Sequence, residues 1–410
     1  MVKKLRPQKN LKIKFRLPTI EKNKMLIKII KDQKEKFLGK NIDEKIVVFQ
    51  SDGWGSARIP NREVFQSLLG KGIKISFKEN KGFRTVLDGF ENPKELNQLL
   101  EILLKHKDAD GKNPVFTFNV TTGNPDFKKI EDHEFSEYFS EPFHHTMERE
   151  RPGVLSLWRS GIDQGLISPQ FMGHDPVNQK RWLDGLIKNR LDLQIAFQYG
   201  VYSLSRTKFT SDYYSIAYEY LPGEDEPYLK ASITQGLTVF KDFFHKWPCS
   251  FVAPFNVTPS YLLKEVRQQG VSVFQSNGIH LLPRKVKNGE MMYHRKFFVS
   301  GLDRHTNSVQ LIRNCRFEPA FFPTENEAGR CLKEIGQAFR YRRPAVISSS
   351  RSNYVGIFDE KIPEESLGQL DTLLAGIIKT WPDVKFYTTE QIAHLYDKQE
   401  NSKLKSLSSV

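Results

Sequence analysis

The stretch that decides the fold class is Lys45-Ile46-Val47-Val48-Phe49-Gln50-Ser51-Asp52-Gly53-Trp54-Gly55. Its four consecutive apolar residues, set between a lysine and a glycine-rich turn, predict a short strand buried on both faces. In an α/β protein, the end of such a strand holds polar groups on a rigid element that still reaches solvent. Asp52 is therefore the first candidate for chemistry, and the alternative is that it only begins a turn.

Outward from this strand, helical and strand-like patterns alternate along the chain without a fixed sequence repeat. The predicted helices span residues 93–104, 158–166, 179–189, 233–245, 259–269, 326–340 and 367–381. The predicted strands span residues 73–77, 115–119, 194–197, 250–254, 271–275, 345–349 and 384–387. Residues 198–227 are expected to form a long loop, and residues 276–326 to be irregular with hairpins. This alternation is typical of a parallel sheet wound by helices.

The positive charge of the chain is concentrated at its N-terminus. The net charge is +14, and residues 1–45 contain fifteen Lys/Arg and five Asp/Glu, which gives +10 for that segment. A basic arm and helix over residues 1–44 suggest a peripheral contact with an acidic polymer or an anionic lipid surface, although a solvated amphipathic helix is the favoured interpretation. The rest of the chain is near neutral and has no basic and aromatic strip, so nucleic-acid binding is not expected.

The cysteine, histidine and hydropathy patterns argue against several other classes. Cys249, Cys315 and Cys331 have no Cys-x-x-Cys spacing, which argues against a disulfide framework and a structural zinc site. His144-His145, beside Glu141 and Glu148, suggests metal ligands, but a surface pair is favoured. No apolar run reaches the ~20 residues of a membrane span, and the N-terminus lacks the apolar core of a secretory signal. A cytoplasmic location is therefore expected.

Polar residues gather just after several predicted strands, where a parallel sheet places them at one common end. They are Asp52, Asn119, Asn124, His174, Asp175, Asn256 and the run Ser350-Arg351-Ser352-Asn353. Asparagine and arginine side chains that bind sugar hydroxyls, with Trp54, Tyr199 or Tyr202 stacking on sugar rings, would suit a carbohydrate groove. The alternative for each asparagine alone is turn chemistry.

The order and spacing of short motifs then make the chain recognisable. They are Ser51-Asp52-Gly53-Trp54-Gly55-Ser56-Ala57-Arg58, Asn124-Pro125-Asp126-Phe127, Glu141-Pro142-Phe143, Pro169-Gln170-Phe171, Asn178 with Arg181-Trp182-Leu183, Phe251-Val252-Ala253-Pro254, Asn314-Cys315-Arg316-Phe317-Glu318-Pro319, residues 348–354 and Trp381-Pro382-Asp383-Val384. In these motifs the chain resembles the polysaccharide deacetylase family over about residues 45–395. More narrowly, it is similar to a bacterial subgroup of polysaccharide (de)acetylase-like proteins found with surface-polysaccharide genes. The resemblance implies a distorted β/α barrel and hydrolysis of N-acetyl or O-acetyl groups on glycans.

The first and last motifs depart from that family at positions that carry its chemistry. The family usually has paired aspartates in the first motif, one acting as a base and one as a metal ligand, whereas Asp52 is followed by Gly53. In a register one residue earlier, Ser51 replaces the base and Asp52 remains the ligand. The last motif usually has a histidine before the arginine, and here Ser350 precedes Arg351.

The middle motif also lacks residues that carry the family's chemistry. After Pro-Gln-Phe the subgroup has a His-x-x-x-His pair that completes the metal site, and Met172 and Pro176 stand at those positions here, with His174 and Asp175 between them. A catalytic metal needs about three protein ligands and an open position for water, and a methionine thioether is a poor ligand for it. The resemblance with these departures implies that the usual metal site is lost or altered.

The sequence thus predicts an α/β fold, a distorted (β/α) barrel of the polysaccharide deacetylase type over residues 45–397, between the basic arm (1–44) and a polar tail (398–410). The expected function is to act on or bind a bacterial surface glycan, or to assist other polysaccharide-biosynthesis proteins, without a cofactor. The alternative is an active carbohydrate N- or O-deacetylase with a zinc site rebuilt from Asp52, His174 and Asp175.

The candidate site residues follow from these interpretations. The candidate catalytic residues are Asp52, Asp175 and Arg351, and the candidate metal ligands are Asp52 and His174. The candidate substrate-binding residues are Trp54, Asn178, Asn256 and Asn353. A single pocket at the carboxyl end of the strands is expected to be lined by Asp52, His174, Asn178, Asn256 and Arg351.

Overall fold

A mainly parallel sheet forms the centre of the computed structural model, which describes residues 30, 33–35, 38–73, 88–202, 214–221, 223–285, 291–303, 306–323 and 325–408. The strand order is β10-β11-β7-β6-β5-β2-β1-β13-β12, and β14 pairs with the start of β1. The strands span Ile46–Trp54 (β1), Phe116–Thr121 (β2), Ile167–Gly173 (β5), Ser250–Val252 (β6), Val273–Ser276 (β7), Gly301–Asp303 (β10), Ser308–Ile312 (β11), Cys315–Arg316 (β12), Ala345–Ser350 (β13) and Lys385–Phe386 (β14). Most of the N-terminal arm and of the strand expected at residues 73–77 lies outside the described residues.

The sheet closes on itself through a short segment that follows β11. β11 pairs with β7 and β12 pairs with β13, yet only Arg313 and Asn314 separate β11 from β12 in the chain. The Arg313 N–H donates to the Ser276 carbonyl at 2.8 Å, and the Asn314 N–H donates to the Val346 carbonyl at 3.1 Å. Two strands that lie far apart in the sheet order are therefore joined, which confirms the distorted β/α barrel.

Alternate residues of β1 face the barrel interior and the surrounding helices. Ile46 and Val48 share an apolar cluster with β7, β11 and β13, strands from around the barrel. Val47 and Phe49 belong instead to the main core beneath the helices. This alternation is the period of two that a β-strand imposes, and it directs Gln50 and Asp52 into the interior.

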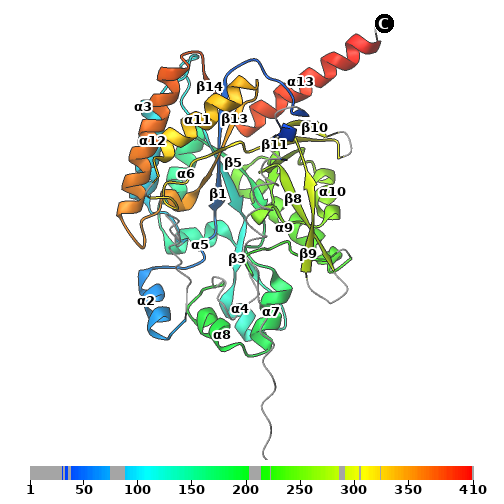
Figure 1. Cartoon of the computed structure of the whole chain (residues 1–410). Coiled ribbons are helices and arrows are strands. Elements are labelled where there is room, and N and C mark those ends of the chain that lie inside the picture. Colours follow the sequence, from blue (N-terminus) through cyan, green and yellow to red (C-terminus); the bar gives the residue numbers. More distant parts are fainter. Residues whose placement is uncertain are drawn as a thin grey trace, which may run out of the picture.

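The helices cover the outside of the barrel (Figure 1). They span Arg62–Gly70 (α2), Pro93–Lys105 (α3), Phe127–Asp132 (α4), Phe143–Glu150 (α5), Val154–Asp163 (α6), Gln179–Ile187 (α7), Leu191–Gln198 (α8), Glu226–Phe244 (α9), Ser260–Gln268 (α10), Glu327–Arg340 (α11), Lys361–Thr380 (α12) and Thr389–Ser408 (α13). α3 begins where Asn92-Pro93 predicts, because Asn92 and Glu95 form a reciprocal capping box. Short pairs of antiparallel strands, β3 (Gly123–Pro125) with β4 (Ser140–Pro142) and β8 (Ile279–Lys285) with β9 (Met291–Phe297), stand apart from the barrel.

One segment differs from the sequence prediction. Residues 194–197, expected as a strand, lie within α8, which buries Leu193, Ala196 and Phe197 at helical spacing. The short apolar run there was compatible with both the helical and the strand periodicity. In the segment expected as a polar tail, α13 continues as helix to Ser408. No helix in the described part of the chain is long and apolar enough to span a membrane.

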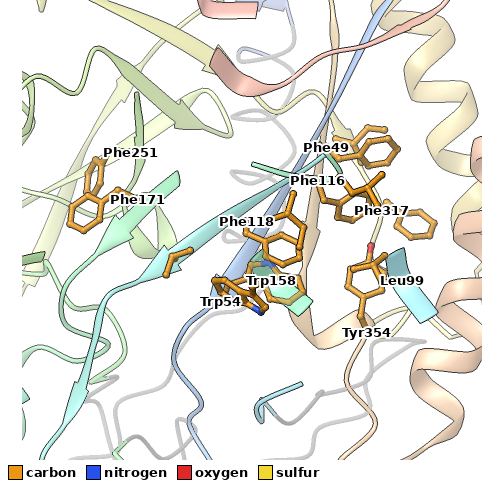
Figure 2. Close-up of a cluster of buried hydrophobic side chains, with 14 of the residues drawn as sticks. Phe49, Trp54, Leu99, Phe116, Phe118, Trp158, Phe171, Phe251, Phe317 and Tyr354 are labelled. Atoms are coloured by element: carbon orange, nitrogen blue, oxygen red, sulfur yellow. The ribbon is translucent and has the colours of Figure 1, made fainter. Parts of the chain in front are cut away.

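The main core is rich in stacked aromatic rings (Figure 2). Trp54 at the end of β1 lies flat against Phe118 of β2, with ring centroids 3.5 Å apart, and meets Trp158 of α6 edge-on at 5.9 Å. Its indole N–H donates to Ser51 Oγ at 3.0 Å. Trp54 is fully buried, so it fastens β1 to β2 and α6 and is not available to stack on a sugar.

Candidate functional site

A cavity of about 1110 Å³ opens at the carboxyl ends of the barrel strands. Its lining includes Asp52 after the apolar part of β1, Met172 of β5, Val252 of β6 and Ser350 of β13. The cavity continues past Arg313 and Arg316 toward the C-terminal end of α11. Parallel strands direct their carboxyl ends to one side of a sheet, so side chains from distant parts of the chain meet here.

Asp52 is held on both of its carboxylate oxygens by one arginine. Arg313 Nη1 lies 2.5 Å from Asp52 Oδ2, and Nη2 lies 2.8 Å from Oδ1. Asn119 of β2 donates a further hydrogen bond to Oδ1 at 2.8 Å. A bidentate, charge-assisted pair of this kind fixes the carboxylate in place and neutralises it from inside the protein.

Below this pair, a network of hydrogen-bonded side chains fills the barrel interior. Arg313 Nε donates to Gln50 Oε1 at 2.9 Å, and Nη2 donates to Gln275 Oε1 at 2.8 Å. Gln275 and Asn119 exchange two hydrogen bonds, at 2.8 and 2.9 Å. Each polar group of the pair is therefore satisfied by built-in partners, which is what keeps a buried charge pair tolerable.

The positions at which the family resemblance expects metal ligands or an acid all lie in this cavity. Gly53, Met172, Pro176 and Ser350 belong to its lining together with Asp52. In the sheet, Asp52 and Ser350 are direct neighbours in the β1–β13 register. These motif positions thus meet at one place in the fold, and Gly53, Met172, Pro176 and Ser350 carry neither a carboxylate nor an imidazole group there.

His174 and Asp175 lie outside the cavity lining, in separate hydrogen-bond sets. His174 is buried, with Nδ1 3.1 Å from Thr122 Oγ1 and Nε2 2.8 Å from Ser140 Oγ. Burial lowers the pKa of His174 and favours its neutral form, against the opposing effect of Asp175. Asp175 accepts hydrogen bonds from Ser232 at 2.6 Å and from Tyr228 at 2.9 Å.

This arrangement does not fit the zinc site that the alternative interpretation would need. Both oxygens of Asp52 are engaged by Arg313, and both ring nitrogens of His174 contact hydroxyl groups. Among the described residues, no three His, Cys, Asp or Glu side chains group together in a way that could hold a metal ion. His144 and His145 belong to no such group: their rings contact each other, and the His144 ring stacks on Phe243.

Arg351 and Asn353 are buried behind the cavity. Arg351 pairs with Glu91 at 3.2 Å and with Asp88, and it donates to the Ser56 carbonyl at 2.7 Å. Asn353 donates to Glu318 Oε2 at 2.9 Å and accepts from the Ala320 N–H at 3.1 Å. These contacts anchor the loops that follow β1 and β13, so both residues have structural partners where a catalytic or sugar-binding role was expected.

The other substrate-binding candidates divide between the cavity and the scaffold. Asn256 lines the cavity, and its Oδ1 accepts from the Asn277 N–H at 3.3 Å. Tyr202 also lines it, with its hydroxyl 3.2 Å from Ser56 Oγ. Asn178 is buried as the N-cap of α7 and donates to the Glu219 carbonyl at 3.1 Å. Of the five residues expected to share one pocket, Asp52 and Asn256 line the cavity, and His174, Asn178 and Arg351 do not.

Two polar residues of the site were missed in the sequence. Arg313 follows a strand in a region that the sequence pattern left irregular, and nothing local in the chain indicates its pairing with Asp52. Glu318 lies behind Ser350, whose hydroxyl donates to Glu318 Oε1 at 3.0 Å. Burial raises the pKa of Glu318 to about 8, against the lowering effect of its hydrogen bonds from Asn353 and Ser350. An acidic residue in the quoted Glu318-Pro319 motif was the available signal.

No family model matches the chain, and no curated protein matches its sequence. Several solved structures do. A proposed polysaccharide deacetylase from Mycobacterium smegmatis is 12% identical, with 87% of this chain and 92% of that chain covered and a TM-score of 0.40. A probable polysaccharide deacetylase from Pseudomonas aeruginosa is 11% identical, with 86% and 91% covered and a TM-score of 0.39.

The matches also include a protein named for a different reaction. A 4-alpha-glucanotransferase from Thermococcus litoralis is 10% identical, with 85% of this chain and 40% of that chain covered and a TM-score of 0.41. At such values each likeness is weak, so the fold assignment depends on the strand order and closure of this barrel itself. The chain is a distorted β/α barrel protein, with polysaccharide deacetylases among its structural matches.

Proposed function

We propose that the protein binds a bacterial surface glycan in the cavity at the carboxyl end of its barrel, without the metal-dependent deacetylation that its sequence motifs suggest. The observation that carries this proposal is the composition of the cavity. Gly53, Met172, Pro176 and Ser350, which the resemblance assigns to the ligand and acid positions, belong to its lining, and Arg313 holds Asp52, the aspartate that remains of these motif positions.

The rest of the lining suits a sugar. The lining includes the hydroxyl-bearing residues Ser56, Ser215, Ser352 and Tyr202 and the amide-bearing residues Asn256 and Asn277. Such groups both donate and accept hydrogen bonds, as sugar hydroxyls require. The partly exposed ring of Phe255, 52% accessible, lies in the same lining and offers an apolar surface beside them.

The test is binding of the purified protein to an array of bacterial surface polysaccharides, with a variant that fills the cavity. Met172→Trp places a large ring in the lining and should abolish binding. Trp247→Ala removes a half-exposed ring outside the cavity lining and should leave binding unchanged. Wild-type protein that binds no glycan, or a Met172→Trp variant that binds as well as wild type, would contradict the proposal.

A second candidate function is metal-independent ester hydrolysis by the Ser350–Glu318 pair. Ser350 faces the cavity, and its hydroxyl contacts a carboxyl group whose pKa is raised to about 8. Once ionised, a carboxyl group with so high a proton affinity is a stronger base than usual and accepts the serine proton as Ser350 Oγ attacks the acyl carbon. The sugar oxygen takes that proton as its bond to the acyl carbon breaks, and a water molecule then hydrolyses the acyl-serine to release acetate. Acetate release from acetylated sugars or from 4-nitrophenyl acetate should then increase between about pH 7 and 9 and disappear in Ser350→Ala. Activity that persists in Ser350→Ala would exclude this candidate.

A further inference from the structure

One partly buried arginine of the cavity, Arg58, has no hydrogen-bond or ion-pair partner among the described residues. Among the described residues, the arginines of the lining are Arg58, Arg313, Arg316, Arg330, Arg340 and Arg343. Arg313 pairs with Asp52, Arg316 and Arg330 with Glu327, and Arg343 with Glu35. Arg340 is exposed at the end of α11. Arg58 is partly buried and, in the described part of the chain, contacts neither a carboxylate nor a carbonyl group; its Nε atom is buried without a hydrogen-bond partner.

The carboxylates of the lining do not balance this charge. Asp52, Asp88, Glu35 and Glu334 each pair with an arginine other than Arg58. A guanidinium that is partly removed from water without a partner carries a free-energy cost. The cavity therefore holds an unbalanced positive charge close to its hydroxyl-bearing wall.

Arg58 is placed beside the groups that suit a sugar. It follows Ser56 by two residues in the loop after β1, and both residues line the cavity with Tyr202. Burial and the nearby charge of Asp88 raise the pKa of Tyr202, and the hydrogen bond to Ser56 and the charges of Arg58 and Arg351 oppose that rise, so Arg58 lies near the phenol together with Asp88. The planar guanidinium offers paired N–H donors that match the oxygens of a carboxylate or a phosphate.

From these contacts we infer that Arg58 forms an anion-binding subsite, and that the glycan bound in the cavity carries a carboxylate or phosphate group that reaches it. This inference rests on the proposed glycan binding and narrows it to acidic sugars. Neutral sugars would leave the Arg58 guanidinium without a partner, so they should bind more weakly.

The experiment compares three probes by isothermal titration calorimetry on the full chain. They are an oligogalacturonate for the carboxylate, glucose 1-phosphate for the phosphate, and a neutral xylo-oligosaccharide of similar length. At least one acidic probe should bind about tenfold more tightly than the neutral one, since a charge-assisted hydrogen-bonded pair contributes about that factor. The tighter of the two acidic probes identifies the source of the anion. Their advantage should decrease as the salt concentration increases.

Two variants locate the effect. Arg58→Gln should remove the preference for the acidic probe and leave neutral-sugar binding and the melting temperature nearly unchanged, because Arg58 has no partner to lose among the described residues. Arg340→Gln, which removes an exposed arginine of the same lining, should keep the preference. Equal binding of acidic and neutral probes, or an unchanged preference in Arg58→Gln, would overturn this inference alone. Absence of binding by all three probes would overturn the proposed glycan binding and this inference with it.

Discussion

Arg313 balances the charge of Asp52 with a side chain of the protein itself. The two groups come from β1 and from the segment that closes the barrel, and both face the interior network. Each of the two charges is tolerated in this enclosed position only because the other is present. Without Arg313, the Asp52 carboxylate would lose most of its hydration without gaining a partner. The pair is therefore a structural element of the site as well as part of its chemistry.

We predict that Arg313→Met destabilises the protein by about 3 kcal/mol, since it leaves Asp52 without its partner in a largely enclosed position. The double variant Asp52→Asn with Arg313→Met should recover part of that loss, because the unpaired charge is gone. Urea unfolding of the wild type, both single variants and the double variant measures this coupling. Additive losses in the double variant would show that the two side chains do not act as a pair.

Glu318 gives a second prediction at this scale, with a defined sign. Its pKa is about 8 in the folded chain and lies near the ordinary value of about 4.5 when unfolded, so between these values the folded state binds the extra proton. The contribution of Glu318 to stability therefore decreases as the pH increases from about 4.5 to about 8, by at most about 1.4 kcal/mol per pH unit.

Glu318→Gln, which cannot ionise, should remove this decrease. The free energy of unfolding of the variant minus that of the wild type should thus increase between pH 5 and 8, as followed by urea unfolding at each pH. A difference that stays constant over this range would mean that Glu318 ionises normally in the folded protein.

Among the elements, β1 connects the core to the site. Up to Asp52, its odd-numbered residues pack under the helices and its even-numbered residues face the interior. After the register shift between Asp52 and Trp54, Trp54 ends the strand between Phe118 and Trp158 (Figure 2). The tryptophan that sequence reasoning assigned to sugar stacking therefore fixes the position from which Asp52 reaches the cavity.

Trp54→Ala should lower the free energy of unfolding by about 3–5 kcal/mol, because it leaves a cavity among fully buried rings. Trp247→Ala is the matched control, since Trp247 is 50% exposed, and it should change stability by less than about 1 kcal/mol. Urea unfolding monitored by circular dichroism compares the two variants. Similar losses in both would show that Trp54 is not a core residue.

The elements that sequence reasoning located are those with local signals. β1 shows an apolar run before a glycine turn, and α3 shows an asparagine cap followed by proline and glutamate. The residues it missed depend on long-range pairing: Arg313 reaches Asp52 only because β11 and β12 close the barrel. The sequence analysis assigned polar residues after several predicted strands to one site, but a strand end directs alternate side chains inward and outward. Asp52 faces the cavity, and His174 and Arg351 turn into the scaffold.

For the molecule as a whole, the composition of the cavity leads to a prediction about metal. Purified wild-type protein should contain far less than one zinc per chain after incubation with zinc and desalting, as measured by inductively coupled plasma mass spectrometry. Gly53→Asp, Met172→His and Pro176→His together should raise zinc uptake only modestly, because Arg313 still occupies both oxygens of Asp52.

Adding Arg313→Gln to these three substitutions should free Asp52 and give the largest uptake of the series. Stoichiometric zinc in the wild type, lost in Asp52→Ala, would contradict this prediction and support the rebuilt metal site. Equal zinc uptake by the triple variant with and without Arg313→Gln would show that Arg313 does not compete with a metal ion for Asp52.

The start of α13 closes the opposite end of the barrel. Thr389 Oγ1 accepts from Gln50 Nε2 at 3.0 Å and lies 2.9 Å from Thr117 Oγ1, while Ile392, Ala393 and Tyr396 join Ile46 and Val48 in the interior cluster. Any shortened version of the protein that stops before Thr389 would expose the amino-terminal end of the barrel to water and leave Gln50 without this contact. The smallest independently folding unit therefore extends at least through Tyr396, although every residue that lines the cavity precedes residue 353.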